Sequence, residues 1–137
     1  MHYLKIVGEA APKTPLLYYH IPVWTGVNIN MGKFLNEIAS QVPTFQGIKY
    51  TSNDLDGGLA ALKANKGNYA VFLGADTLMA SAFAMGFDSV IATTLNIVPQ
   101  YAVKIRDAIK GNKVKEAREL QLRLNEICAI ITKNGKR

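Results

Sequence analysis

The chain has little cysteine, which limits its covalent chemistry and suggests where it works. Cys128 is the one cysteine among 137 residues, so no disulfide can form within the chain. A lone thiol is typical of a reducing compartment, and residues 1–5 lack the long apolar stretch of a signal peptide. We therefore expect a cytoplasmic protein.

Linkers, low-complexity stretches and blocks of like charge are also missing from the chain. Its 137 residues, of which 49% are hydrophobic, are enough for one domain with a buried core. We therefore expect a single domain over residues 1–137.

Charged residues are scarce between positions 77 and 103, a stretch long enough to span a bilayer. Asp88 lies in its middle, Gly86 precedes that residue and Pro99 follows it. These breaks favour a helix, a turn, a strand and a second helix over a membrane span, so we expect no membrane partner.

Acidic residues are outnumbered, and the net charge is +6. Such an excess can mark an anionic partner, and most of it lies in the last third of the chain. Glu116, Glu119 and Glu126 are interleaved with those basic residues, which is typical of a solvated helix face. Since no nucleic-acid module accompanies them, we expect no nucleic-acid partner.

Four short apolar runs are present, and they read as strands near residues 16–21, 45–49, 69–73 and 89–93. None alternates cleanly, which suits strands of a parallel sheet that are buried on both faces. A helical pattern follows each run, so the sequence predicts an α/β fold of four βα units with right-handed crossovers. A complete eight-stranded barrel needs roughly 250 residues. We therefore expect half of a (β/α)8 barrel.

Two helix patterns give further expectations. Asn53 is placed to cap the helix that follows the second strand. A long helix over residues 113–133 closes the chain and ends at Asn134 and Gly135. Its apolar residues predict the buried face: Val114, Ala117, Leu120, Leu124, Ile127 and Ile131.

The carboxyl ends of the predicted strands carry the candidate site, because working residues of such barrels sit there. A phenol, an amine, a carboxylate and a hydroxyl are expected on one rim, with a glycine among them: Tyr19, Lys49, Asp76, Thr93 and Gly74. An inward lysine among apolar neighbours is desolvated, which favours the neutral amine. A neutral amine can attack a carbonyl and form a Schiff base.

Each of these residues also has a structural interpretation. Lys49 could be a solvated charge at a strand end, and Tyr19 a rim aromatic with a wet hydroxyl. Asp76 could be a helix N-cap, and Thr93 an ordinary strand-end or turn residue. His20 alternates away from Tyr19 on its strand, so we interpret it as structural.

Three segments together carry a family resemblance. They are Tyr-Tyr-His-Ile-Pro at residues 18–22 with Thr-Gly-Val at 25–27, Thr-Phe-Gln-Gly-Ile-Lys at 44–49, and Gly-Ala-Asp at 74–76. In this order they resemble the N-acetylneuraminate lyases (sialic acid aldolases), in particular the animal forms, within the dihydrodipicolinate synthase superfamily. The resemblance runs from about Leu4 to Gly135 and covers the C-terminal half of that family's barrel.

The resemblance implies a class I aldolase that uses neither a metal nor an organic cofactor. Such an enzyme cleaves N-acetylneuraminate reversibly into N-acetylmannosamine and pyruvate, and the family forms homotetramers. Lys49 matches the Schiff-base lysine, and Tyr19 matches the tyrosine that moves the proton. The positions that hold the sugar portion are implied to be Thr51, Gly74, Asp76 and Thr93.

The chain also departs from the family pattern. Asp76-Thr77 stands where the family commonly has Asp-Glu, and Ala-Thr-Thr-Leu-Asn at residues 92–96 replaces Gly-Ser-Thr-Tyr-Asn. The loop of Gly-Thr-Thr/Ser-Gly type that binds the substrate carboxylate does not occur, so we interpret the chain as a truncated form. Two alternatives stay open: a related pyruvate-dependent aldolase or synthase, and an inactive fragment that pairs through open strand edges. Val23-Trp24 stands where the synthases usually carry an arginine, which weighs against their commonest member.

Overall fold

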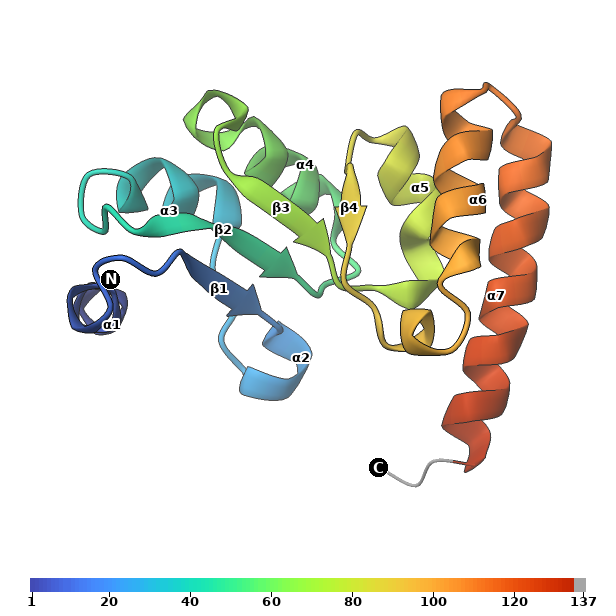
Figure 1. Ribbon diagram of the computed structural model, residues 1–137, viewed down its shortest axis with the longest axis horizontal. Helices are drawn as coiled ribbons and strands as arrows, with labels where there is room; N and C mark the ends of the chain where they lie inside the picture. The colour runs from blue at the N-terminus through green and yellow to red at the C-terminus, as the bar shows by residue number, and fades with distance from the viewer. Residues whose placement is uncertain (135–137) are drawn as a thin grey trace. The chain divides into compact units, whose positions relative to one another are not determined.

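The computed structural model describes residues 1–134, and the chain falls into two compact units (Figure 1). Unit 1 runs from Met1 to Phe72, and unit 2 begins at Leu73. The single domain expected over residues 1–137 stays a prediction, and the helix end expected at Gly135 lies outside the described residues.

Unit 1 holds the N-terminal helix and the first strands, each followed by helical segments. Its elements are α1 (His2–Ala10), β1 (Leu16–His20), α2 (Pro22–Thr25), α3 (Met31–Ile38), β2 (Phe45–Tyr50), α4 (Leu55–Lys63), the 3-10 helix η1 (Ala64–Gly67) and most of β3 (Ala70–Leu73).

Unit 2 is mainly helical. From Leu73 onwards it contains η2 (Asp76–Leu78), α5 (Met79–Ala84), β4 (Ser89–Val90), η3 (Thr93–Asn96), α6 (Gln100–Lys110) and α7 (Val114–Asn134).

The strands form one sheet in the order β1-β2-β3-β4, and helices alternate with them along the chain. β1 and β2 are parallel, with Tyr18 opposite Ile48 and Tyr19 opposite Lys49. The predicted α/β class is therefore confirmed. Each strand overlaps its predicted run, but β4 has only two residues because the chain turns into η3 at Thr93.

Aromatic rings connect α3 to one face of the sheet in unit 1. The ring of Phe34 on α3 lies 5.5 Å from that of Tyr18 and 5.7 Å from that of Phe45. Phe45 in turn contacts Tyr69 edge to face, at 5.3 Å between centroids. Tilted and edge-to-face pairs at such separations stabilise a core beyond the area they bury, so α3 is held firmly against β1 and β2.

His20 belongs to this packed face of β1. It is 2% exposed and its ring stacks on that of Tyr50 at 5.3 Å. Burial lowers its pKa from the usual value of 6.5, and the nearby charge of Asp54 opposes the shift only in part. Among the described residues no group hydrogen-bonds its Nδ1 atom. The contacts agree with the structural role expected for His20.

The helix after β2 begins one residue later than the sequence pattern predicted. Asp54, rather than Asn53, is the N-cap of α4, and its Oδ1 atom accepts a hydrogen bond from the amide of Gly57 at 2.9 Å. The Tyr50 hydroxyl donates to the carbonyl oxygen of Asp54 at 2.7 Å. Because the hydrogen bond from Tyr50 fixes the backbone of Asp54 next to the strand, Asp54 takes the capping position.

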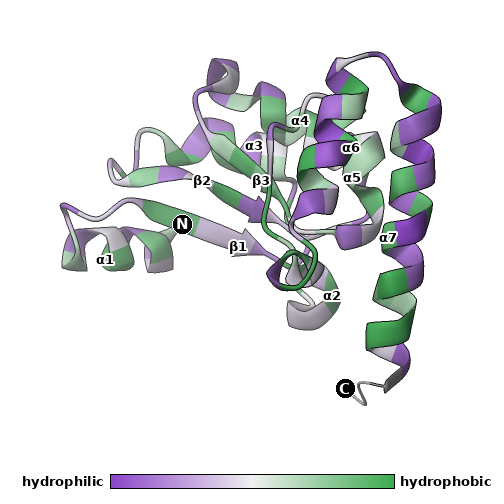
Figure 2. Ribbon diagram, turned by 45° about the vertical axis from the view of Figure 1, so that its right-hand side comes forward, coloured by the Kyte–Doolittle hydropathy of each residue, from purple (hydrophilic) through white to green (hydrophobic). Residues whose placement is uncertain are grey.

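In unit 2 the buried face of α7 differs from the expected one. Ala117 and Leu124 are fully buried and Gln121 is 8% exposed, whereas Val114 is 67% exposed. Residues 117, 121 and 124 follow the spacing of one helix face, which packs on α6 and η2. The expectation is confirmed for Ala117 and Leu124 and wrong for Val114, and the buried stripe also includes a glutamine that it left out. Figure 2 shows hydrophilic and hydrophobic residues alternating along α6 and α7.

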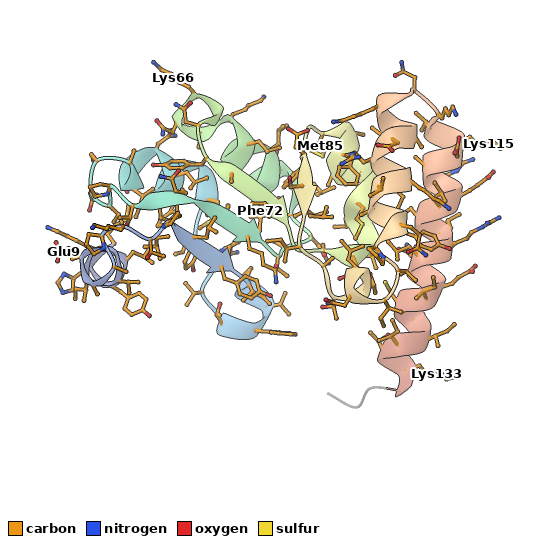
Figure 3. All side chains as sticks on the ribbon, in the orientation of Figure 1. Glu9, Lys66, Phe72, Met85, Lys115 and Lys133 are labelled. Atoms are coloured by element: carbon orange, nitrogen blue, oxygen red, sulfur yellow. The ribbon has the colours of Figure 1, made fainter. Side chains whose placement is uncertain are left out.

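The basic residues of α7 lie on its solvated face, as predicted. The labelled Lys115 and Lys133 are exposed (Figure 3). Lys113, just before the helix, forms an exposed ion pair with Glu116 at 3.6 Å. Within residues 1–134 no helix has both the length and the apolar character needed to cross a membrane.

Gly47 allows β2 and β3 to come together, which gives a first test of the fold. A Cβ atom at Gly47 would clash with the carbonyl oxygen of Ala70 on β3. Gly47→Ala should therefore lower the free energy of unfolding by about 1–3 kcal/mol, the usual cost of overpacking. Urea denaturation followed by circular dichroism measures it. The control Gln46→Ala changes an exposed neighbour on the same strand; equal midpoints for the two variants would contradict the close approach.

A second test uses the buried imidazole. Because its pKa is lowered, His20 binds a proton less readily in the folded chain than in the unfolded chain. His20 should therefore cost no stability above about pH 6.5, and the free energy of unfolding should decrease as the pH drops below that value. His20→Phe keeps an aromatic ring without a titrating group, so it should reduce this loss. Denaturant titrations at about pH 7.5 and about pH 5.5 measure the difference.

The chain supplies its own control for this experiment. His2 is the other histidine and is exposed. His2→Asn should leave the pH dependence of the parent chain unchanged. An identical loss of stability in the parent and in His20→Phe would show that His20 does not cause the effect.

Candidate functional site

Tyr19 and Lys49 stand side by side on β1 and β2. They are register partners, so their side chains project from the same face of the sheet. The Lys49 ammonium nitrogen lies 4.1 Å from the centroid of the Tyr19 ring. A cation this close to an aromatic face is attracted by the ring's quadrupole. The structure thus brings the predicted amine and the predicted phenol into contact.

This face of the sheet is more open than the sequence suggested. Lys49 is half-buried, and its neighbours Tyr19 and Leu17 are 45% and 47% exposed. The helix α3 packs on the opposite face, through Tyr18. Lys49 is therefore partly solvated in the chain as described, and its desolvation by apolar neighbours stays a prediction.

Thr51 follows β2 directly, two residues after Lys49. Its amide donates to the carbonyl oxygen of His20 at 2.8 Å, which fixes the backbone at this point. Its hydroxyl is buried, and within residues 1–134 it has no hydrogen-bond partner. An unsatisfied buried hydroxyl costs about 1–3 kcal/mol, so a polar ligand group that reached it would gain that energy.

Asp76 lies in unit 2, just after Gly74 and Ala75 at the end of β3. Its Oδ1 atom accepts hydrogen bonds from the amide of Thr94, at 2.8 Å, and from the Thr94 hydroxyl. The N-cap interpretation of Asp76 is wrong, since Ala75 holds that position of η2 and no side chain caps it. The carboxylate instead joins the loop after β3 to the loop after β4.

Thr93 and Thr94 have different surroundings. Thr93 is exposed, and its carbonyl oxygen accepts from the Asn96 amide group at 3.1 Å. Thr94 is 4% exposed, and its amide donates a hydrogen bond to the Asp76 carboxylate. Sequence reasoning missed both Thr94 and Gln121, a buried residue of α7 that contacts the Asp76 backbone at 3.1 Å. The sequence did carry a signal for Gln121: it lies four residues after Ala117 and three before Leu124, on the same face of the helix.

The six predicted residues divide between the units: Tyr19, Lys49 and Thr51 belong to unit 1, and Gly74, Asp76 and Thr93 belong to unit 2. Their convergence on one rim stays a prediction. In the described part of the chain, no group of three or more histidine, cysteine, aspartate or glutamate side chains is arranged to hold a metal ion.

Sequence comparison finds relatives along the whole chain. The profile of the dihydrodipicolinate synthetase family matches residues 1–137. The N-acetylneuraminate lyase of Mus musculus is 31% identical over 134 residues. That alignment covers 97% of this chain but 42% of the mouse protein, so the chain spans less than half the length of this relative.

Solved structures agree with the expected fold. The N-acetylneuraminate lyase (sialic acid aldolase) of Aliivibrio salmonicida superposes with a TM-score of 0.91 and 26% identity, over 96% of this chain and 44% of that one. A variant of 2-keto-3-deoxygluconate aldolase from Sulfolobus solfataricus gives a TM-score of 0.78 and 28% identity, over 93% and 41% of the two chains. These matches confirm a partial (β/α)8 barrel with a long C-terminal helix.

Proposed function

Because the chain belongs to the dihydrodipicolinate synthetase family, we propose that it carries the nucleophile of a class I, pyruvate-dependent aldolase. The proposed reaction is the reversible cleavage of N-acetylneuraminate into N-acetylmannosamine and pyruvate. The observation that carries the proposal is the contact between Lys49 and Tyr19, an amine and a phenol 4.1 Å apart on neighbouring strand ends.

Lys49 is the proposed nucleophile. Its amine adds to the ketone carbon of the substrate, water leaves, and a protonated imine forms. When the carbon–carbon bond breaks, its electron pair moves toward the imine nitrogen and an enamine results. Protonation of the enamine and hydrolysis of the imine then release pyruvate and the free amine. This sequence requires no metal and no organic cofactor.

Tyr19 is the proposed proton carrier. Bond cleavage needs a group that removes a proton from the substrate hydroxyl, and a phenol within hydrogen-bond reach can do so. Its place beside Lys49, on the same face of the sheet, supports this role. Its 45% exposure leaves the ring partly accessible.

The sugar portion is proposed to bind at the segments that carry Thr51, Gly74, Asp76 and Thr93. The buried, unpartnered hydroxyl of Thr51 supports this proposal, since hydroxyl-rich ligands offer both donors and acceptors. At the next position the chain has Thr77, so a second carboxylate beside Asp76 is missing.

A second candidate is a related aldolase that uses the same lysine with another acceptor aldehyde. The 28% identity to a 2-keto-3-deoxygluconate aldolase supports this candidate, and the 31% identity to the mouse N-acetylneuraminate lyase supports the first. Both candidates form the same pyruvate imine. They differ in the aldehyde that restores the carbon–carbon bond, so assays with N-acetylmannosamine and with glyceraldehyde separate them.

Assembly with further polypeptide is also part of the proposal. The chain spans 42% of the mouse relative, and Leu17 and Tyr19 leave an apolar part of β1 exposed. We propose a cytoplasmic protein that acts as a homo-oligomer, a tetramer by resemblance. A fragment that only binds other chains is the third candidate, and it would form no pyruvate imine.

Trapping with pyruvate and borohydride tests the central claim. Borohydride reduces an imine to a stable secondary amine, so intact-mass spectrometry should find a pyruvate adduct and peptide mapping should place it on Lys49. Lys49→Arg should abolish the adduct, because arginine stays charged and cannot attack a carbonyl. Lys63→Arg, at an exposed lysine of α4, is the matched control and should keep it.

The outcomes separate the candidates. An adduct that survives in Lys49→Arg would reject the assigned nucleophile. A folded parent chain that forms no adduct would reject the aldolase proposal and favour the binding fragment.

The unpartnered hydroxyl of Thr51 gives a second test. Thr51→Val keeps the shape of the side chain and removes the unsatisfied group, so the free energy of unfolding should stay equal or rise by about 1 kcal/mol. Affinity for N-acetylmannosamine in the presence of pyruvate should fall about tenfold, the loss expected for one hydrogen bond to the ligand. Denaturant titration and isothermal calorimetry measure the two quantities.

Thr44 provides the control because its hydroxyl is also buried without a partner among the described residues. It immediately precedes β2, at the opposite end of the strand from Thr51. Thr44→Val should change stability in the same direction and leave sugar affinity untouched. Equal sugar affinity in both variants would remove Thr51 from the proposed site.

A further inference from the structure

The carboxylate of Asp76 accepts hydrogen bonds from another residue of the chain. One oxygen, Oδ1, accepts both the amide and the hydroxyl of Thr94. Thr94 is 4% exposed, so these bonds form largely out of water, where a bond to a charged acceptor is stronger than one between neutral groups. The two residues are 18 positions apart in the chain, and the contact joins the segments that follow β3 and β4.

Thr94 in turn shapes the loop after β4. Its carbonyl oxygen accepts from the amides of Ile97, at 3.0 Å, and Val98, at 2.9 Å. These bonds close the turn η3, which contains Thr93. The position of Thr93, a residue proposed to contact the sugar, therefore depends on how Thr94 is held.

Asp76 is itself held from the C-terminal helix α7. The side-chain amide nitrogen of Gln121 donates to the backbone carbonyl oxygen of Asp76 at 3.1 Å and to the side-chain oxygen of Asn125 at 2.8 Å. The side-chain oxygen of Gln121 accepts from the amide of Ala80 at 2.9 Å. Both amide hydrogens and the oxygen are thus used, and the side chain is 8% exposed, so its orientation is fixed.

The negative charge of Asp76 also affects the pKa of Cys128, a residue of α7. Burial raises the pKa of its thiol first, and the negative charge of Asp76 raises it further.

We propose that Asp76 is a positioning residue, and that Gln121, Asp76 and Thr94 form a brace that sets the loops after β3 and β4 from α7. Asp76 then acts on a ligand through Thr94 and the turn that carries Thr93, and its carboxylate need not grip the ligand. The consequence for catalysis rests on the proposed function, but the brace does not.

Hydrogen exchange of the Thr94 amide, followed by NMR on the whole chain, tests the brace directly. Asp76→Ala removes the acceptor and should speed exchange at Thr94 by about tenfold or more, the loss expected for a bond to a charged group. Asp76→Asn keeps an oxygen at Oδ1 and should retain most of the protection. The amide of Ile105, fully buried in α6, reports whether unit 2 stays folded in each variant.

Two further variants examine the remaining parts of the brace. Gln121→Leu removes the hydrogen bond from α7 to the backbone of Asp76. It should also speed exchange of the Thr94 amide, although Gln121 does not bond to Thr94. Asp88→Asn is the matched control: it removes an exposed carboxylate of unit 2 whose ion-pair partner is Lys110. It should leave the Thr94 amide unchanged. Unaltered exchange at Thr94 in both Asp76→Ala and Gln121→Leu would overturn the brace.

Cleavage of N-acetylneuraminate by the same variants distinguishes positioning from direct contact. If Asp76 acts through Thr94, Asp76→Ala and Thr94→Val should both lose about tenfold or more in kcat/KM. The double variant should lose no more than the larger single loss, since the two residues share one contact.

The opposite pattern assigns a different role. If Asp76→Ala is impaired while Thr94→Val is normal, the carboxylate contacts the ligand itself and the positioning role is wrong. A parent chain that forms no imine with pyruvate would reject the proposed function, and the exchange rates at Thr94 would still decide whether the brace exists.

Discussion

The parallel register of β1 and β2 is the constraint on which the candidate chemistry depends. It places Tyr19 opposite Lys49 and puts both side chains on one face, while Tyr18 and His20 face the aromatic core. A slip by one residue would exchange the two faces, because side chains alternate along a strand. The packing of Phe34 against Tyr18 therefore fixes not only the core of unit 1 but also the side on which the amine is found.

Backbone polar groups at the strand ends impose a second constraint. A chain that leaves a strand must find partners for its amides and carbonyls away from the ladder. After β2 the chain uses Tyr50 and the Asp54 cap, and after β3 and β4 it uses Asp76, Thr94 and Gln121. The Thr51 hydroxyl is left without a partner in the described residues, in contrast with these satisfied groups.

Local pattern was sufficient for some features and insufficient for others. Apolar runs predicted each strand within a few residues, because a buried parallel strand must be apolar along its length. The cap at Asp54 in place of Asn53 could not be chosen from propensity, since both residues are good caps and the Tyr50 hydroxyl decides between them. Gln121 was missed on the buried face of α7 because its burial is accompanied by hydrogen bonds, which hydrophobic periodicity does not register.

The sequence by itself determined the α/β class, the order of the elements and the residues that resemble a lysine-dependent aldolase, since these depend on local pattern and on short motifs. Tertiary structure alone decided that the Lys49 ammonium lies on the Tyr19 ring in a half-open face, and that Asp76 bonds to Thr94 instead of capping its own helix. The physical reason is that both contacts join residues distant in sequence. Their geometry follows from strand register and helix packing, which no local pattern encodes.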